Sequence, residues 1–119
     1  MTKLLSPLLA SFILFACTTT ENAKKIAGSW RGAAWTSNGQ PIGQDPAVIA
    51  FTFGADGNYT YVNAGITERG LYQVQDNDVY TKPEGGEEIK VHIASITKDT
   101  LVFEMNRSGA PELLTLVRK

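Results

Sequence analysis

Reactive and metal-binding side chains are scarce in this sequence, which has one cysteine, Cys17, and one histidine, His92. A lone cysteine has no partner for an intramolecular disulfide, and one histidine cannot complete a typical zinc site with it. The sequence also lacks the Gly-x-Ser-x-Gly pattern around which many hydrolase triads are built. We therefore expect a protein that is not an enzyme and that carries no metal or other cofactor.

An excess of positive charge is absent as well. Eleven Lys and Arg residues stand against twelve Asp and Glu residues, which gives a formal net charge of −1. Binding to a phosphate backbone depends on clustered basic side chains. We expect no nucleic-acid partner.

The N-terminal apolar stretch, residues 4–16, is short for a membrane span. It contains two serines and a proline, whereas a spanning helix needs about twenty mostly apolar residues. Lys3 precedes it and the small residue Ala16 ends it, which is the pattern of a secretory signal peptide. The sequence therefore predicts a cleavable signal peptide over residues 1–16.

The residues around the predicted cleavage site, Leu14, Ala16 and Cys17, resemble the lipobox of bacterial lipoproteins. This resemblance implies that Cys17 is acylated and that the chain is anchored by lipid in the cell envelope, in the outer membrane. The alternative is an ordinary secretory signal followed by an unmodified cysteine. Residues 18–25 are polar and lack apolar periodicity, so residues 17–25 are interpreted as a lipidated cysteine with a tether, and residues 26–119 as one folded domain.

From residue 26 onward the hydrophobic pattern has a period of two, with turn residues every eight to twelve positions. This pattern is typical of a β-sandwich or β-barrel. No helical periodicity interrupts it. We predict eight strands, over residues 28–37, 47–53, 58–63, 70–75, 79–82, 88–96, 100–106 and 113–118.

Short connections between these strands favour antiparallel pairing in sequence order, and eight such strands can close into an up-and-down barrel. The alternation assigns one face to the core and the other to solvent. The predicted core is Trp30, Ile49, Phe51, Phe53, Tyr59, Tyr61, Tyr72, Val74, Val79, Ile89, Val91, Ile93, Leu101, Phe103, Leu114 and Leu116. The predicted outer face includes Arg31, Asn58, Thr60, Gln73, Lys90, His92 and Glu104.

The segment Gly28-Ser29-Trp30 resembles the Gly-x-Trp signature of the lipocalins. In that family the tryptophan plugs the closed end of the barrel and an arginine from the last strand stacks across it. The resemblance implies this role for Gly28, Trp30 and Arg118, and the alternative is a core tryptophan with a solvated terminal arginine. The Asp56-Gly57 turn and later motifs are similar to small lipocalin-like domains of bacterial lipoproteins, and the resemblance covers residues 26–118.

An aromatic inner face favours binding of a small hydrophobic molecule inside the barrel or at its mouth. The candidate ligand-binding residues are Trp35, Phe51, Phe53, Tyr61, Tyr72 and Phe103. Trp35 is expected to point away from Trp30, either exposed as a contact surface or covered by the following Gly/Pro-rich loop. The same aromatic residues are also compatible with a barrel filled by its own side chains.

A second hypothesis is an envelope interaction module, such as a hydrolase inhibitor, that uses the loop of residues 37–46. The expected partners are accordingly the membrane, through the N-terminal lipid, and either a small hydrophobic ligand or an envelope protein.

Overall fold

A computed structural model describes residues 21–107 and 109–119. The predicted signal peptide and Cys17 lie outside the described residues. Within the described part of the chain, no helix is long and apolar enough to cross a membrane.

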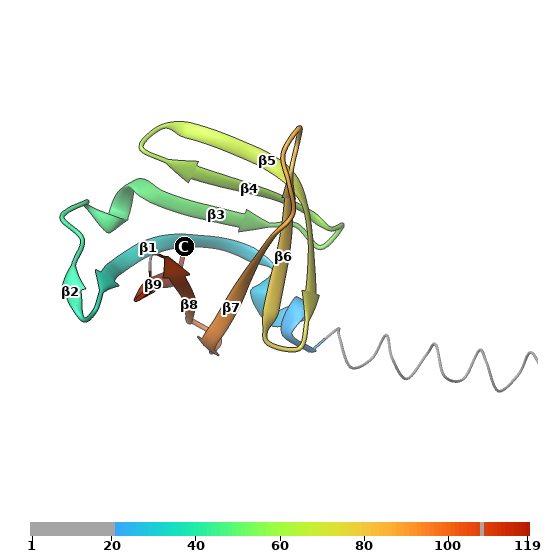
Figure 1. Cartoon of the computed structure of the whole chain (residues 1–119). Helices are drawn as coiled ribbons and strands as arrows, with labels where there is room; N and C mark the ends of the chain where they lie inside the picture. The colour runs from blue at the N-terminus through green and yellow to red at the C-terminus, as the bar shows by residue number, and fades with distance from the viewer. Residues whose placement is uncertain (1–20, 108) are drawn as a thin grey trace, which may run out of the picture.

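The described chain is built almost entirely from β-strands (Figure 1). One 3₁₀ turn, η1, spans Pro46–Val48 and leads into the third strand. The strands are β1 (Gly28–Ser37), β2 (Gln40–Pro41), β3 (Ile49–Phe53), β4 (Asn58–Asn63), β5 (Ile66–Gln75), β6 (Asp78–Pro83), β7 (Ile89–Ile96), β8 (Thr100–Arg107) and β9 (Ala110–Arg118).

The long strands pair antiparallel in sequence order, from β1 with β3 to β8 with β9, and β1 also pairs with β9. This last pairing closes the sheet, because both edges of β1 are then occupied. The predicted eight-stranded up-and-down barrel is confirmed, with the two-residue β2 as an additional strand. The bounds of β1 and β4 agree with the prediction, whereas β5 begins at Ile66 and not at residue 70.

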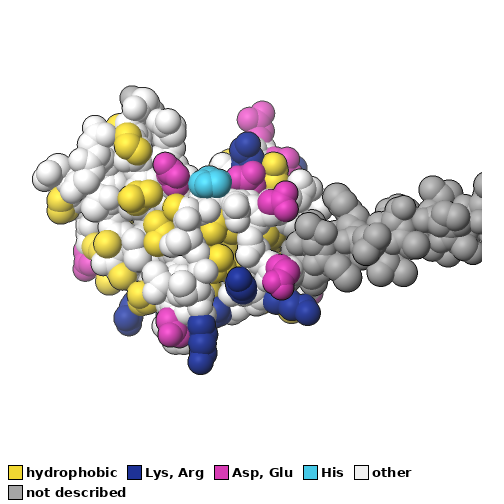
Figure 2. Space-filling model, turned by 90° about the horizontal axis from the view of Figure 1, so that it is seen from below, with side chains coloured by type: hydrophobic (Ala, Val, Ile, Leu, Met, Phe, Trp, Pro, Cys, Tyr) yellow, Lys and Arg dark blue, Asp and Glu magenta, His cyan; other side chains and the backbone are white. Residues whose placement is uncertain are grey.

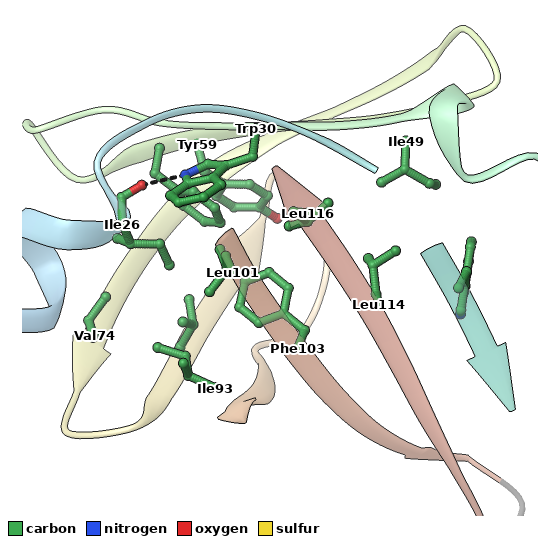
Figure 3. Packing of buried hydrophobic residues seen from close by; sticks show 13 residues of the cluster. Ile26, Trp30, Ile49, Tyr59, Val74, Ile93, Leu101, Phe103, Leu114 and Leu116 are labelled. Carbon is green, nitrogen blue, oxygen red and sulfur yellow. Dashed lines mark hydrogen bonds between the residues drawn. The ribbon is translucent and has the colours of Figure 1, made fainter. Parts of the chain in front are cut away.

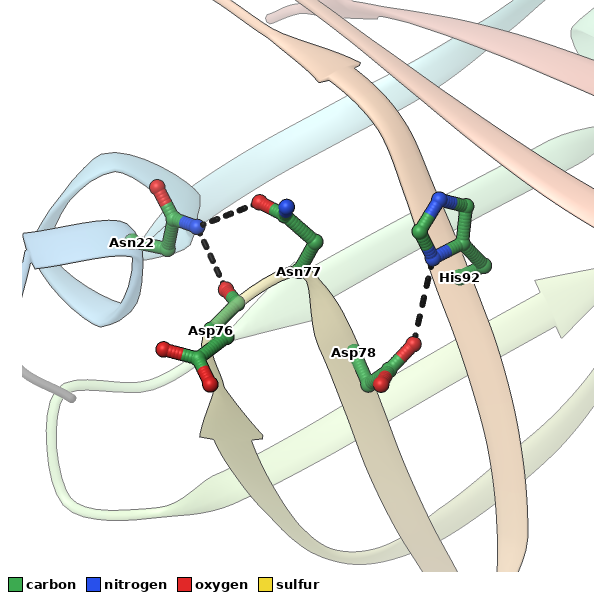
Figure 4. A network of polar contacts seen from close by, with 5 residues as sticks. All are labelled: Asn22, Asp76, Asn77, Asp78 and His92. Carbon is green, nitrogen blue, oxygen red and sulfur yellow. Dashed lines mark hydrogen bonds and ion pairs between the residues drawn. The ribbon is translucent and has the colours of Figure 1, made fainter.

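Residues 21–26 are helical, which corrects the expectation that the polar tether continues to Lys25. This helical turn contacts the barrel: Ala23 packs against the core and Ile26 is fully buried. Asn22 donates hydrogen bonds to the β5–β6 turn, to the carbonyl of Asp76 and to Oδ1 of Asn77 at 3.3 Å (Figure 4). Two apolar residues are too few for a visible sequence periodicity, so only the tertiary contacts reveal the turn.

A β-bulge in β1 changes which way Trp35 points. The register with β9 shifts between Gly32 and Ala34, so Ala33 is an extra residue in the strand. Trp30 and Trp35 are five positions apart and would face opposite sides of a regular strand. With the extra residue both point inward, and Trp35 is only 9% exposed. The prediction that Trp35 faces away from Trp30 was therefore wrong.

The barrel interior is filled by apolar side chains toward one end (Figure 3). Most predicted core residues lie there, and two that were not predicted, Ile26 and Trp35, join them. Ile89 is 52% exposed, which corrects its assignment to the core. It is the first residue of β7 and lies at the edge of the cavity, at the open end of the barrel. The buried cluster is Ile26, Trp30, Trp35, Ile49, Phe53, Tyr59, Val74, Val79, Ile93, Leu101, Phe103, Leu114 and Leu116.

Candidate functional site at the open end of the barrel

One end of the barrel is closed by Trp30. Its side chain is fully buried, and its indole Nε1 donates to the carbonyl of Ile26 at 2.8 Å (Figure 3). The Arg118 guanidinium lies 4.0 Å from the centroid of the Trp30 ring. It also donates to the carbonyls of Lys25 at 2.8 Å and Ala27 at 2.7 Å. These contacts bring together the three residues that the lipocalin resemblance selected, Gly28 among them, and they leave the other end as the entrance.

Gly28 is needed at this closed end because of both its conformation and its neighbour. Its φ of +126° lies in a region that side-chain-bearing residues rarely adopt. A Cβ atom at this position would also collide with Nη1 of Arg118. The glycine of the Gly-x-Trp segment therefore makes room for the arginine that covers the tryptophan.

The opposite end contains a cavity of about 470 Å³, within the roughly 300–1,000 Å³ typical of small-molecule sites. It is lined by residues from all eight long strands, and most of the lining is apolar or aromatic. The lining residues are Trp35, Phe51, Phe53, Tyr59, Tyr61, Glu68, Val79, Thr81, Ile89, Lys90, Val91, His92, Phe103, Glu104, Met105, Asn106 and Leu114. The barrel is thus only partly filled by its own side chains.

Aromatic rings form a continuous panel along this cavity. Phe51 stacks on Tyr61 with ring centroids 4.7 Å apart and on Phe53 at 5.4 Å. The ring of Phe103 meets Phe51 edge-on at 5.7 Å. Such aromatic pairs contribute about 0.5–1.5 kcal/mol each beyond the area they bury, so the panel is held in place before any ligand arrives.

Five of the six predicted ligand-binding residues line the cavity, and Tyr72 does not. Its hydroxyl donates to the carbonyl of Gly54 at 2.7 Å, and its ring meets Phe53 edge-on at 5.0 Å. Burial, with a contribution from Asp56, raises the pKa of Tyr72. Tyr72 therefore braces the β3–β4 turn behind the aromatic panel.

Trp35 contributes its indole ring to the cavity wall, and polar and loop contacts keep it in position. Its Nε1 donates to Oε1 of Glu112 on β9 at 2.9 Å. The loop after β1 folds back beside it, because the Ile42 N–H donates to the Trp35 carbonyl at 3.2 Å and the Ile42 side chain packs against the core. Trp35 is therefore an inner-wall residue and not part of an exposed contact surface.

The cavity also contains a polar pair, Glu68 and Tyr59, of which the sequence pattern predicted only Tyr59, as a core residue. The Tyr59 hydroxyl donates to Oε2 of Glu68 at 2.7 Å. Burial first, and then the neighbouring Glu68 carboxylate, raise the pKa of Tyr59, so the phenol stays protonated and remains a donor. Glu68 lies on the inner face of β5, the same face as Gly70, Tyr72 and Val74, because every second residue of a strand points the same way. This alternation could have identified Glu68, but the predicted strand began only at residue 70.

The barrel wall also opens sideways between β7 and β8. Their pairing runs from Ile96↔Leu101 only as far as His92↔Glu104, so the residues of both strands beyond this point do not pair with each other. Residues 89–92 of β7 and residues 103–106 of β8 all line the cavity. In a continuous wall only every second residue would face inward, so lining by consecutive residues is expected where the two strands no longer pair. Figure 1 shows the loop end of the β6–β7 hairpin rising away from β8 and β9.

The edge of this opening carries charged and polar side chains, Lys90, His92, Glu104 and Asn106. Nδ1 of His92 lies 3.2 Å from Oδ1 of Asp78 on the neighbouring strand, with both side chains partly exposed (Figure 4). No group of three or more His, Cys, Asp or Glu side chains within the described ranges is arranged to hold a metal ion. Figure 2 shows one face of the molecule, where hydrophobic side chains lie between polar and charged ones.

Comparisons with known proteins agree with this architecture. The chain resembles two solved structures: an uncharacterized protein from Bacteroides eggerthii (12% identity, TM-score 0.60) and a lipocalin-like protein from Bacteroides uniformis (13% identity, TM-score 0.59). The alignments cover 79% and 80% of this chain and 99% and 98% of the respective relatives. A comparison with curated proteins finds no match. The family model of the lipocalin-like domain matches residues 26–103, so this chain belongs to the lipocalin-like domain family.

Proposed function

We propose that the barrel is a non-enzymatic binding module that holds a small, largely apolar molecule in the cavity at its open end. The cavity of about 470 Å³ with its aromatic panel is the observation that carries this proposal. Apolar walls favour an apolar ligand, because burial of its surface is worth about 25 cal/mol per Å². The mouth and the opening between β7 and β8 provide access.

Filling the cavity tests this function. Val91 is a half-buried wall residue, and Val91→Phe would place a ring in the cavity. We expect this variant to weaken binding of the fluorescent apolar probe N-phenyl-1-naphthylamine at least tenfold. Gln75→Phe is the matched control, because Gln75 is exposed near the closed end and should leave probe affinity unchanged.

Two results would count against a cavity ligand. Either the wild-type chain fails to bind the probe, or Val91→Phe and Gln75→Phe bind it equally well. Thermal unfolding of both variants checks that loss of binding is not loss of the fold.

We further propose that the chain is an envelope lipoprotein, anchored through acylated Cys17 to the outer membrane. The lipobox-like Leu14, Ala16 and Cys17 support this. Residues 17–21 can span at most about 14 Å, and residues 21–26 lie against the closed end of the barrel. The anchor would then hold the closed end toward the membrane and leave the mouth facing the aqueous side.

Cys17→Ala tests the anchor. We expect wild-type protein to fractionate with outer membranes and its N-terminal peptide to carry acyl mass on Cys17, and the variant to lose both properties. A wild-type N-terminal peptide with an unmodified Cys17 would show that the signal is an ordinary secretory one.

A further inference from the structure

Glu68 places a carboxylate in an otherwise mostly apolar wall. It lies on β5, directly across from Tyr61 of β4 in the strand register, and it is half-buried among the residues that line the cavity. An ionised carboxylate in such a place loses hydration, so it needs partners. Its presence there calls for a function beyond packing.

The protein itself satisfies Glu68 only in part. Tyr59 donates one hydrogen bond to Oε2, and this donor is secure because burial and the carboxylate keep the phenol protonated. Among the described side chains, no lysine or arginine nitrogen lies within 4.0 Å of a Glu68 oxygen. The carboxylate therefore still has acceptor capacity and lacks a cation.

The rings next to Glu68 are suited to the same kind of partner. Tyr61 stands opposite Glu68, Phe51 stacks on Tyr61 at 4.7 Å, and Phe103 meets Phe51 edge-on. Aromatic faces carry negative electrostatic potential and attract organic cations as well as apolar groups. A carboxylate beside such a panel selects for a positive head group attached to an apolar body.

We propose that the ligand of this barrel is a cationic amphiphile, a molecule with an ammonium group that pairs with Glu68 and an apolar part that lies along Phe51, Phe53 and Phe103. This inference rests on the proposed cavity-binding function and names the chemical class of its ligand. Lys90 at the cavity edge is the one described lysine or arginine that lines the cavity, against the two carboxylates Glu68 and Glu104, so the lining as a whole also favours a cation.

Three ligands with the same tail and different head groups test the proposal: octylammonium, 1-octanol and octanoate. Binding is measured by calorimetry on the full chain carrying Cys17→Ser, which avoids lipid and detergent as competitors. We expect octylammonium to bind at least tenfold more tightly than octanol, and octanoate to bind most weakly.

Variants then assign the preference to Glu68. Glu68→Gln should bring the affinities of octylammonium and octanol to within about threefold of each other, chiefly through weaker binding of octylammonium. Glu87→Gln removes the same charge from an exposed residue that does not line the cavity, and it should keep the wild-type preference. The comparison of head groups on the wild-type chain requires no variant to fold.

The outcomes separate the two proposals. If none of the three ligands binds, the cavity-binding function fails and the inference fails with it. If octanol or octanoate binds as tightly as octylammonium, the barrel still binds an apolar molecule and the cationic ligand is ruled out. A preference for octylammonium that survives in Glu68→Gln would also overturn the role given to this carboxylate.

Discussion

Arg118 shows how a single side chain can join segments that lie far apart in the sequence. Its guanidinium covers Trp30 and donates to carbonyls of the chain before β1 and, through Nε, to Lys98 in the β7–β8 turn at 3.1 Å. Hydrogen bonds to a charged donor contribute about 1.5–3 kcal/mol each to stability when they are well formed. The closed end therefore depends on a few specific residues, which makes it sensitive to point changes.

Gly28→Ala should destabilise the protein by roughly 2–4 kcal/mol. The change imposes a strained φ and a collision with Arg118, and strained backbone positions cost about 1–3 kcal/mol each. Gly39→Ala is the control. Gly39 has a φ of +78° and open space around it, so this variant should lose about 1 kcal/mol of stability. Urea denaturation compares the two variants, and equal losses would mean that Arg118 adapts freely.

Tyr59 should make stability depend on alkaline pH. Its pKa is raised in the folded state, so the folded protein holds this proton more tightly than the unfolded chain does. The stabilisation is complete below the unfolded pKa of about 10 and is lost as the pH rises above it, by at most about 1.4 kcal/mol per pH unit. Between about pH 9 and pH 11 the unfolding free energy of wild type should fall more steeply than that of Tyr59→Phe. Parallel curves would refute the assignment.

At the scale of a secondary-structure element, the bulge in β1 decides the composition of the cavity wall. One extra residue, Ala33, brings Trp35 to the inner face, where its Nε1 reaches Glu112 on β9. Bulges often re-aim a side chain close to a functional site. Here the re-aimed indole forms part of the cavity wall.

Deletion of Ala33 should cost about 3–5 kcal/mol, because a regular strand would turn Trp35 out of the barrel or shift the pairing with β9. Ala33→Ser keeps the bulge and should change stability by less than about 0.5 kcal/mol, since Ala33 is exposed. Thermal unfolding and near-ultraviolet circular dichroism report on stability and on the tryptophan environment. A deletion variant with native stability would show that the bulge is dispensable.

At the scale of the whole molecule, the barrel is complete only with the residues that precede β1. The helical turn of residues 21–26 adds Ile26 to the core, and its carbonyl accepts the hydrogen bond from Trp30. Asn22 connects the helical turn to residues 76 and 77 between β5 and β6. Residues 21–26 are thus part of the folded unit.

Ile26→Ala should therefore destabilise the protein by about 2–5 kcal/mol, as is typical when a fully buried aliphatic side chain is truncated. Lys24→Ala, at an exposed position of the same turn, should have an effect below about 0.5 kcal/mol. Chemical denaturation measures both. If the two variants were equally stable, the turn would contribute nothing to the core.

The sequence alone determined the all-β class, the order of the strands and three residues of the closed end, Gly28, Trp30 and Arg118. Period-two alternation and turn residues are local signals, and Gly28, Trp30 and Arg118 matched a short family pattern. Phe51, Phe53, Tyr61 and Phe103, four of the six aromatic residues assigned to the ligand site, line the cavity for the same reason, because alternation predicts which face they share.

Only the tertiary structure decided the direction of Trp35, the docking of residues 21–26, the exposure of Ile89 and the inward position of Glu68. A one-residue bulge reverses the parity of every later residue in its strand and leaves no clear mark in the sequence. The size of the cavity could not be predicted from the sequence either, because it depends on how far β7 and β8 separate from each other. Strand separation and burial depend on contacts between residues distant in the chain, which local periodicity does not encode.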